Sequence, residues 1–264
     1  MNGRITLIGG DRRFLYVSDF FKGRSFEVNT VFLNENSEKT VFNTVILPVP
    51  VLRNGYLNAP LTDEKISANE LTEMLPEGSA VYGGMISESF KAKCVKKGLT
   101  LTDYYTDETL LNENALMTAR AVPFVLEENG FSVSDGDIFI LGNGRCGSAV
   151  ADVLSSLGGN VTVVTGKKSV KKHRFIHFED IEEYIHSASL IVNTVPSTVL
   201  TENELKTLNR NTVIIEIASA PYGVDFDAAL KHGINVIKAP SLPGRYFPKE
   251  AGEAIASTIF KEMN

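Results

Sequence analysis

Three glycines near the middle of the chain have the spacing of a dinucleotide-binding turn. Gly142, Gly144 and Gly147 form G-x-G-x-x-G, which follows the apolar run IFIL and opens the helix-like run AVADVLSSLG. The first glycine allows a tight turn, the second lets the backbone approach a diphosphate, and the third lets the helix pack closely on the strand. Free N–H groups at the helix start favour phosphate. We therefore predict a cofactor site that includes Arg145 and Cys146; the alternative is a purely structural turn.

The two cysteines, Cys94 and Cys146, are far apart and have no C-x-x-C partner. This excludes a disulfide framework and a thiolate zinc site, and it favours a reduced, cytoplasmic compartment. The helix dipole could lower the pKa of the Cys146 thiol and make it reactive, but we favour a packing role beside the turn. The four histidines lack metal-ligand spacing, so no metal is predicted.

The end of the next strand indicates which nucleotide is bound. NAD sites usually carry Asp or Glu there, to bind the ribose hydroxyls. This chain has Thr165, Gly166, Lys167 and Lys168 instead. Thr and Lys can donate to a 2′-phosphate, which a carboxylate would repel. NADP is therefore favoured and NAD stays open. Two alternatives remain for this basic segment, which also includes Lys171, Lys172 and Arg174: a solvated helix face, or a site for another anion.

Later strand ends supply further candidates, because open α/β sheets bind ligands beyond the carboxyl ends of their strands. Asn193 and Thr194 could hydrogen-bond a cofactor ribose or carboxamide, and Pro196 would stiffen their loop. Ser219 and Asp225 follow the strand VIIEI. A loop rich in Pro and Gly then leads into the last helix. Each polar residue here is equally well explained by loop structure.

Strand-like and helix-like runs alternate along the whole chain, and several strands are almost continuously apolar, as in VTVV. This pattern predicts an α/β fold of two doubly wound parallel-sheet domains, the second Rossmann-type. The expected strands are Ile5–Ile8, Phe26–Phe32, Thr44–Leu47, Ala80–Tyr82, Leu99–Asp103, Ile138–Leu141, Val161–Thr165, Leu190–Asn193, Val213–Ile217 and Asn235–Lys238.

A helix from about Asn112 to Asn129, which contains Pro123, is expected to connect the two domains. Residues 1–112 would form a flavodoxin-like substrate domain, braced by a C-terminal helix over 249–264. Residues 113–248, with the linker helix, would form the NAD(P)-binding domain.

Composition excludes two classes of protein. The net charge of -6 argues against a nucleic-acid binder, which needs a positive surface. No segment approaches the roughly 20 apolar residues that span a bilayer, so no membrane association is expected. A homo-oligomer is compatible with the sequence.

Several motifs together resemble the family of the dipicolinate synthase A subunit. They are the N-terminal IGGDRR, the pair Thr118–Ala119, and, in order, ILGNGRCGSAVADVLSSLG, IVNTVPSTVL, VIIEIASAPYGVDFDAALKHGINVIKAPSLPG and FPKEAGEAIA. The resemblance is weak over residues 20 to 110 and strong from 135 onward. It implies a two-domain protein that forms pyridine-2,6-dicarboxylate (dipicolinate) from a 4-hydroxy-tetrahydrodipicolinate precursor of lysine biosynthesis, with NAD(P), for bacterial endospores. It also implies a partner, the flavoprotein-like B subunit.

The chain departs from the family at several positions. The family has Thr-Ala-Glu-Gly where this chain has Thr-Ala-Arg-Ala, an Asp at 216, Gly at 222 and 241, and Thr at 250. This chain carries Arg120, Ala121, Glu216, Tyr222, Ser241 and Glu250 there. The identity of the substrate is therefore less firmly predicted than the class of cofactor.

A dicarboxylate substrate of that kind needs cations. Arg12 and Arg13 follow Gly9, Gly10 and Asp11, and arginine binds carboxylates bidentately. We therefore predict a substrate site that includes Asp11, Arg12 and Arg13, together with Ser219. The alternative is a first helical turn with surface charge, in which Asp11 is an N-cap.

Catalysis also requires a proton acceptor. Lys249, Asp225 or water is expected to fill this role, because no histidine is well placed. Two other functions remain open: an NADP-dependent dehydrogenase of another small carboxylic acid, and a non-catalytic nucleotide-binding subunit or sensor.

Overall fold

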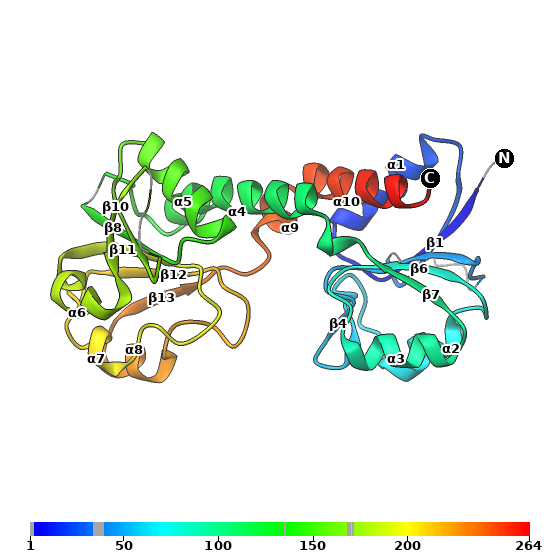
Figure 1. Cartoon of the computed structure of the whole chain (residues 1–264), viewed down its shortest axis with the longest axis horizontal. Coiled ribbons are helices and arrows are strands. Elements are labelled where there is room, and N and C mark those ends of the chain that lie inside the picture. Colours follow the sequence, from blue (N-terminus) through cyan, green and yellow to red (C-terminus); the bar gives the residue numbers. More distant parts are fainter. Residues whose placement is uncertain (1–2, 34–39, 135, 168–169, 171) are drawn as a thin grey trace. The chain divides into compact units, whose positions relative to one another are not determined.

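The computed structural model describes residues 3–33, 40–134, 136–167, 170 and 172–264. The chain forms two compact units: unit 1 is Met1–Glu113 with Phe247–Asn264, and unit 2 is Asn114–Tyr246. Each unit is a parallel sheet with helices on both faces (Figure 1). The predicted fold class, α/β with two doubly wound parallel sheets, is confirmed.

The sheet of unit 1 has the strand order β2-β1-β3-β6-β7, and all of its pairings are parallel. Its strands are β1 (Arg4–Ile8), β2 (Glu27–Val31), β3 (Thr44–Ile46), β6 (Ala80–Gly83) and β7 (Thr100–Asp103). Counted within this sheet alone, the order is 2-1-3-4-5, which is that of flavodoxin-like folds.

Helices cover both faces of this sheet. Figure 1 shows α1 (Arg13–Lys22) and α10 (Pro248–Glu262) on one face, and α2 (Ala68–Met74) and α3 (Glu88–Lys96) on the other. Neighbouring strand residues face opposite layers: Leu7 packs in the α1–α10 core, and Ile8 in the α2–α3 core.

A short hairpin, β4 (Leu52–Arg53) and β5 (Tyr56–Leu57), follows β3. Asn54 and Gly55 form its turn, with φ values of 51° and 83°. Both residues are thus in the left-handed region that a type I′ turn requires. The Gly10 N–H donates to the Asn58 carbonyl at 2.8 Å, so the base of the hairpin is held at the end of β1.

The sheet of unit 2 has the order β10-β9-β8-β11-β12-β13 and is also entirely parallel. Its strands are β8 (Asp137–Leu141), β9 (Asn160–Thr165), β10 (Arg174–His177), β11 (Ala188–Asn193), β12 (Val213–Glu216) and β13 (Asn235–Lys238). This is the 3-2-1-4-5-6 order of dinucleotide-binding folds, and its switch point lies between β8 and β11.

Helices again cover both faces (Figure 1). On one side lie α5 (Arg145–Ser156) and the second half of α4 (Glu108–Glu128); on the other lie α6 (Ile181–Tyr184), α7 (Glu202–Leu205) and α8 (Phe226–His232). Short 3₁₀ turns occupy Phe178–Asp180 and Ile185–Ser187 in this unit and Tyr104–Thr106 in unit 1. Among the described residues, no helix has the length and apolar composition that a membrane crossing needs.

Three features differ from the sequence predictions. The hairpin β4–β5 and the edge strand β10 are not among the strands that the sequence predicts. The loop expected before the last helix contains a short helix, α9 (Leu242–Tyr246). Pro243 lies in the first turn of α9, where a missing N–H costs no helical hydrogen bond. The long helix α4 continues through Pro123.

Candidate functional site

The glycine turn of unit 2 has the geometry that a diphosphate requires. Gly142 has φ +99°, a conformation that favours glycine. A Cβ at Gly147 would lie 2.1 Å from the Gly142 carbonyl oxygen, so only glycine lets α5 approach β8 this closely. At Gly144 no described atom beyond its chain neighbours lies within 4 Å of a Cβ position. The turn is therefore closed by backbone on one side and open beside Gly144.

The start of α5 provides the donors. Gly144 is its N-cap, so no capping side chain accepts from the first-turn N–H groups, and the first turn contains no acidic residue. Those N–H groups and the positive end of the helix dipole are suited to an anion. An exposed Arg145 adds a cation at the first helical position. The residues of this turn thus fit the diphosphate of a dinucleotide.

Cys146 lies in the first turn of α5, as predicted, but its pKa does not fall. Burial raises the pKa of the thiol, and the positive charge of Arg145 offsets this only in part. The thiol is therefore held in its protonated form near neutral pH, which favours a packing role over a reactive one.

The end of β9 lies beside the glycine turn. The Lys167 Nζ donates to the Asn143 carbonyl at 2.6 Å, and the Lys167 N–H donates to the Thr165 Oγ1 at 3.1 Å. Gly166 between them is exposed, and no described atom beyond its chain neighbours lies within 4 Å of a Cβ position there. Thr165, Gly166 and Lys167 are thus grouped at the edge of the turn.

The remainder of the basic segment is partly described. Lys168 and Lys171 lie outside the described residues. Lys172 and His173 both contact the Asp152 carboxylate, at 2.9 Å and 2.8 Å. Hydrogen bonds from these two residues lower the pKa of Asp152. The alternative of a basic helix face is wrong for the described residues, because they form a non-helical segment that leads into β10.

The side chains of Asn193 and Thr194, at the end of β11, both hydrogen-bond other groups of the protein. Asn193 is fully buried, and its amide bonds to Glu216 and to the backbone of Val195. The Thr194 Oγ1 donates to the Leu141 carbonyl at 2.8 Å and packs against Gly142. Pro196 is exposed. These side chains shape the turn more than they present donors to a ligand.

The loop after β12 contains two predicted site residues. Ser219 is exposed at its surface. Asp225 is the N-cap of α8, and its Oδ1 accepts from the Ala228 N–H at 3.0 Å. This capping bond explains the position of Asp225 without a catalytic role.

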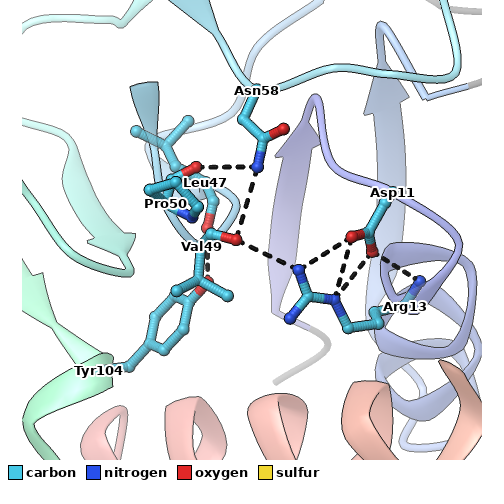
Figure 2. A network of polar contacts seen from close by, with 7 residues as sticks. All are labelled: Asp11, Arg13, Leu47, Val49, Pro50, Asn58 and Tyr104. Atoms are coloured by element: carbon cyan, nitrogen blue, oxygen red, sulfur yellow. Dashed lines mark hydrogen bonds and ion pairs between the residues drawn. The ribbon is translucent and has the colours of Figure 1, made fainter. Parts of the chain in front are cut away.

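In unit 1 the predicted substrate residues divide into two groups. Figure 2 shows the Arg13 guanidinium between the Asp11 carboxylate and the Val49 carbonyl. The Arg13 Nε and Nη2 each lie 2.9 Å from an Asp11 oxygen, and Nη2 lies 3.2 Å from the Val49 oxygen. The Arg13 side chain is 8% exposed. Asp11 and Arg13 therefore form an internal ion pair, while the neighbouring Arg12 is exposed.

Burial and charge act in opposite directions on Asp11. Burial alone would raise its pKa, but hydrogen bonds from Arg13 and the positive charges of Arg13 and Arg53 lower it. The same pairing raises the pKa of Arg13 despite burial. Close by, the buried Tyr104 donates to the Leu47 carbonyl at 3.0 Å (Figure 2). Burial strongly raises the pKa of its phenol.

The hairpin brings two further residues, Arg53 and Asn58, to this edge of the sheet, and neither is among the site residues that the sequence predicts. Arg53 is exposed and close enough to act on Asp11. The Asn58 Nδ2 donates to the Pro50 carbonyl at 3.1 Å (Figure 2). The dipeptide Asn54-Gly55 is a strong hairpin signal and could have revealed both.

Lys249 is exposed in the first turn of α10, which belongs to unit 1. It therefore shares a unit with Arg12 and Arg53. Within the described parts of the chain, no group of three or more His, Cys, Asp or Glu side chains has a metal-binding arrangement.

Comparisons with known proteins match both units. Residues 4–105 match the family described as the N-terminal domain of the dipicolinate synthase A subunit. Residues 101–231 match the family described as D-isomer specific 2-hydroxyacid dehydrogenase, NAD binding domain. The chain is 23% identical to the dipicolinate synthase A subunit of Bacillus subtilis (strain 168), over 98% of this chain and 95% of the relative.

Solved structures show the same fold. The dipicolinate synthase A subunit from Bacillus halodurans matches with a TM-score of 0.86 and 22% identity, over 99% of this chain and 97% of that one. The corresponding dipicolinate synthase structure from Bacillus subtilis matches with 0.83 and 22%, over 100% and 96%. A transhydrogenase from Sinorhizobium meliloti is more distant, with 0.69 and 14%, over 98% and 93%.

These matches confirm the predicted resemblance to the dipicolinate synthase A subunit, which extends along the whole chain. The match over residues 101–231 confirms the prediction of a dehydrogenase with a domain for a nicotinamide dinucleotide.

Proposed function

Because this chain resembles the dipicolinate synthase A subunit over its whole length, we propose that it is an oxidoreductase subunit that forms dipicolinate. Its substrate would be a 4-hydroxy-tetrahydrodipicolinate precursor, and its product would serve endospore formation. Loss of water, then of a hydride and a proton, converts this cyclic imine to the aromatic product. The observation that carries the proposal is the open glycine turn at Gly144. The relative that points to dipicolinate as the product is the dipicolinate synthase A subunit of Bacillus subtilis.

We propose NADP as the cofactor, with NAD as the alternative. When bound, its nicotinamide supplies the hydride acceptor. The first-turn N–H groups of α5 would hold the diphosphate. Gly166 and Lys167, at the end of β9, leave room and positive charge for a 2′-phosphate, and Thr165 carries no negative charge that would repel it. Arg145, exposed at the first position of α5, would add positive charge.

On the substrate side, exposed guanidinium groups support recognition of a dicarboxylate. Arg12 and Arg53 are both exposed at the carboxyl edge of the first sheet. The internal ion pair of Asp11 and Arg13 would hold the turn that carries Arg12. In this proposal Asp11 and Arg13 support the substrate site without contacting the substrate. Planar guanidinium groups bind carboxylates bidentately.

The proton released on aromatisation needs an acceptor. Lys249 remains the candidate side chain, because it is exposed at the start of α10. Asp225 is less suited, since it caps α8. Ser219 stays a candidate for substrate contact. The implied partner is a flavoprotein-like B subunit.

A hydride-transfer assay tests the proposal. The purified chain, alone and with a B-type subunit, is mixed with NADP or NAD and the freshly generated cyclic imine, and reduction is followed by absorbance. We expect reduced cofactor and dipicolinate in equal amounts. Reduction with another small carboxylic acid but not with the imine would favour a different dehydrogenase. Cofactor binding without any reduction would favour a non-catalytic subunit.

The candidate base has its own test. Lys249→Met should lower turnover by at least about tenfold and leave cofactor affinity unchanged. Unchanged turnover would remove Lys249 from the mechanism.

A further inference from the structure

Glu216, the last residue of β12, is a buried carboxylate that accepts hydrogen bonds from the end of β11 and from the loop after β12. It is 1% exposed. The Asn193 Nδ2 lies 2.8 Å from its Oε1 and 3.0 Å from its Oε2. The Ala218 N–H donates to Oε1, and the Gly223 N–H donates to Oε2, each at 3.0 Å. One carboxylate thus joins the last residue of β11 to both ends of the loop after β12.

The Asn193 amide also hydrogen-bonds the backbone of the turn that follows β11. Its Oδ1 accepts from the Val195 N–H at 3.1 Å, and its Nδ2 also donates to the Val195 carbonyl at 3.0 Å. A Cβ at Gly223 would lie 2.3 Å from the Asn193 Nδ2 and 2.6 Å from the Val195 oxygen. The two loops are therefore in direct contact around Glu216.

The position of these loops gives the arrangement a function. In a doubly wound sheet, a dinucleotide lies across the carboxyl edge, with its diphosphate at the first glycine turn and its two halves on either side of the switch point. The turn after β8 and the end of β9 would take the adenosine side. The loops after β11 and β12 would then face the nicotinamide side.

We propose that Glu216 is a positioning residue for the nicotinamide half of the cofactor site. It touches no ligand itself; it fixes the segments 193–197 and 217–224 on which that half would rest. This inference rests on the proposed dinucleotide function and adds to it the group that shapes the second half of the site.

Only an acceptor fits this position. The hydrogen bonds that Glu216 accepts come from N–H donors, and an ionised carboxylate is an acceptor alone. Burial raises the pKa of Glu216, whereas the hydrogen bonds from Gly223, Asn193 and Ala218 act in the opposite direction. Gln has nearly the same shape, but its NH₂ group would face an N–H donor and leave a buried donor without an acceptor.

The opposite edge of the same sheet supplies a matched control. Asp137, at the start of β8, accepts from the Asn160 Nδ2 at 2.6 Å and from the Ser187 Oγ at 2.9 Å. It too is a carboxylate that joins two segments, but it lies at the amino ends of the strands. Asp137→Asn therefore removes a comparable charge without touching the cofactor side.

The test compares a dinucleotide with its adenosine half. Affinities of the full chain, of Glu216→Gln and of Asp137→Asn are measured by calorimetry for NADP and for adenosine 2′,5′-bisphosphate, or for NAD and ADP if NAD is the ligand that binds. For Glu216→Gln we expect about a tenfold loss of dinucleotide affinity. The adenosine fragment should bind within about twofold of the unmodified chain, and Asp137→Asn should change neither affinity.

Other outcomes overturn the inference. Equal losses for dinucleotide and fragment would mean that Glu216 acts only on overall folding. Unchanged dinucleotide affinity would mean that its bonds do not shape the site. If the unmodified chain binds no dinucleotide, the proposed function itself fails, and this inference with it.

A second variant covers the case in which Glu216→Gln does not fold. Glu216→Asp keeps an acceptor but is one methylene shorter. It should lose part of the dinucleotide affinity and none of the fragment affinity. A loss of both would contradict the proposal.

Discussion

Two turns of this molecule share a design and differ in what occupies them. In each unit the first strand of the sheet ends in glycines with positive φ, and a helix follows: Gly9 and Gly10 before α1, and Gly142 before α5. In unit 1 a Cβ at Gly10 would lie 2.4 Å from the Phe14 ring, and one at Gly9 would lie 3.0 Å from Leu57. That turn is filled by the protein's own side chains.

The turn of unit 2 is open. No described atom beyond the chain neighbours lies within 4 Å of a Cβ position at Gly144, and no acidic residue occupies the first turn of α5. In unit 1 the corresponding region holds the carboxylate of Asp11, paired with Arg13. The same strand–turn–helix unit is therefore suited to a phosphate in one case and to an internal ion pair in the other.

The largest expected effect concerns the filled turn. Arg13→Met leaves the Asp11 carboxylate and the Val49 carbonyl without their main donor, and breaking a buried pair in this way costs about 3 kcal/mol. Urea unfolding measures the loss. Arg12→Met, at an exposed position, should change the free energy of unfolding by less than about 0.5 kcal/mol. Similar losses in the free energy of unfolding for Arg13→Met and Arg12→Met would contradict the placement of Arg13 in an internal ion pair and of Arg12 at the surface.

A substitution in the open turn of unit 2 should change ligand affinity strongly and stability little. In Gly144→Val the added Cβ has no described atom within 4 Å beyond its chain neighbours, so the free energy of unfolding should change by less than about 1 kcal/mol, the cost of a poorer N-cap. Dinucleotide affinity should fall about 30-fold, because the side chain occupies the space beside the first-turn N–H groups. Gly144→Ala should give a smaller loss. Full affinity in the Val variant would show that the ligand does not approach this glycine.

The choice between NADP and NAD can be tested at Gly166. Gly166→Asp introduces a carboxylate at the end of β9 into open space. It should weaken NADP binding about tenfold through repulsion of the 2′-phosphate, without weakening NAD binding. Gly166→Asn has the same shape without charge and is the control. Equal effects of Asp and Asn on NADP would argue against a 2′-phosphate at this position.

The smallest expected effect is a pH dependence from Asp11. Its folded-state pKa is lowered, so the carboxylate stabilises the fold above its unfolded-state pKa of about 3.9 and loses this contribution as the pH falls through the folded-state value. Asp11→Asn cannot titrate. Its deficit in free energy of unfolding, relative to the unmodified chain, should shrink by about 1 kcal/mol on acidification, since charged hydrogen bonds exceed neutral ones by that amount. A deficit independent of pH would contradict the assignment.

Features set by local sequence could be predicted, and features set by distant partners could not. The glycine turn has local requirements, a positive φ at Gly142 and a close approach at Gly147, and these follow from spacing alone. The sequence also predicts the strands β9 and β12, because each is a nearly continuous apolar run. The edge strand β10 was missed because only Ile176 of its four residues is buried, so it lacks an apolar run.

The roles of the polar residues depend on contacts that spacing does not reveal. Arg13 is held by Val49, 36 residues away, and Asn193 by Glu216, 23 residues away. The sequence predicts ligand contacts for both, because Asn193 lies at the end of a strand and the Arg13 guanidinium can bind a carboxylate. Their burial shows instead that a polar residue at a strand end can be part of the support beneath a site.

The most direct test of this account is the stoichiometry of dinucleotide binding, measured by calorimetry on the full chain. If only the turn of unit 2 is open, one NADP or NAD molecule binds per chain, and Gly144→Val weakens that binding about 30-fold. Two molecules per chain, none at all, or an isotherm unchanged by Gly144→Val would contradict the account.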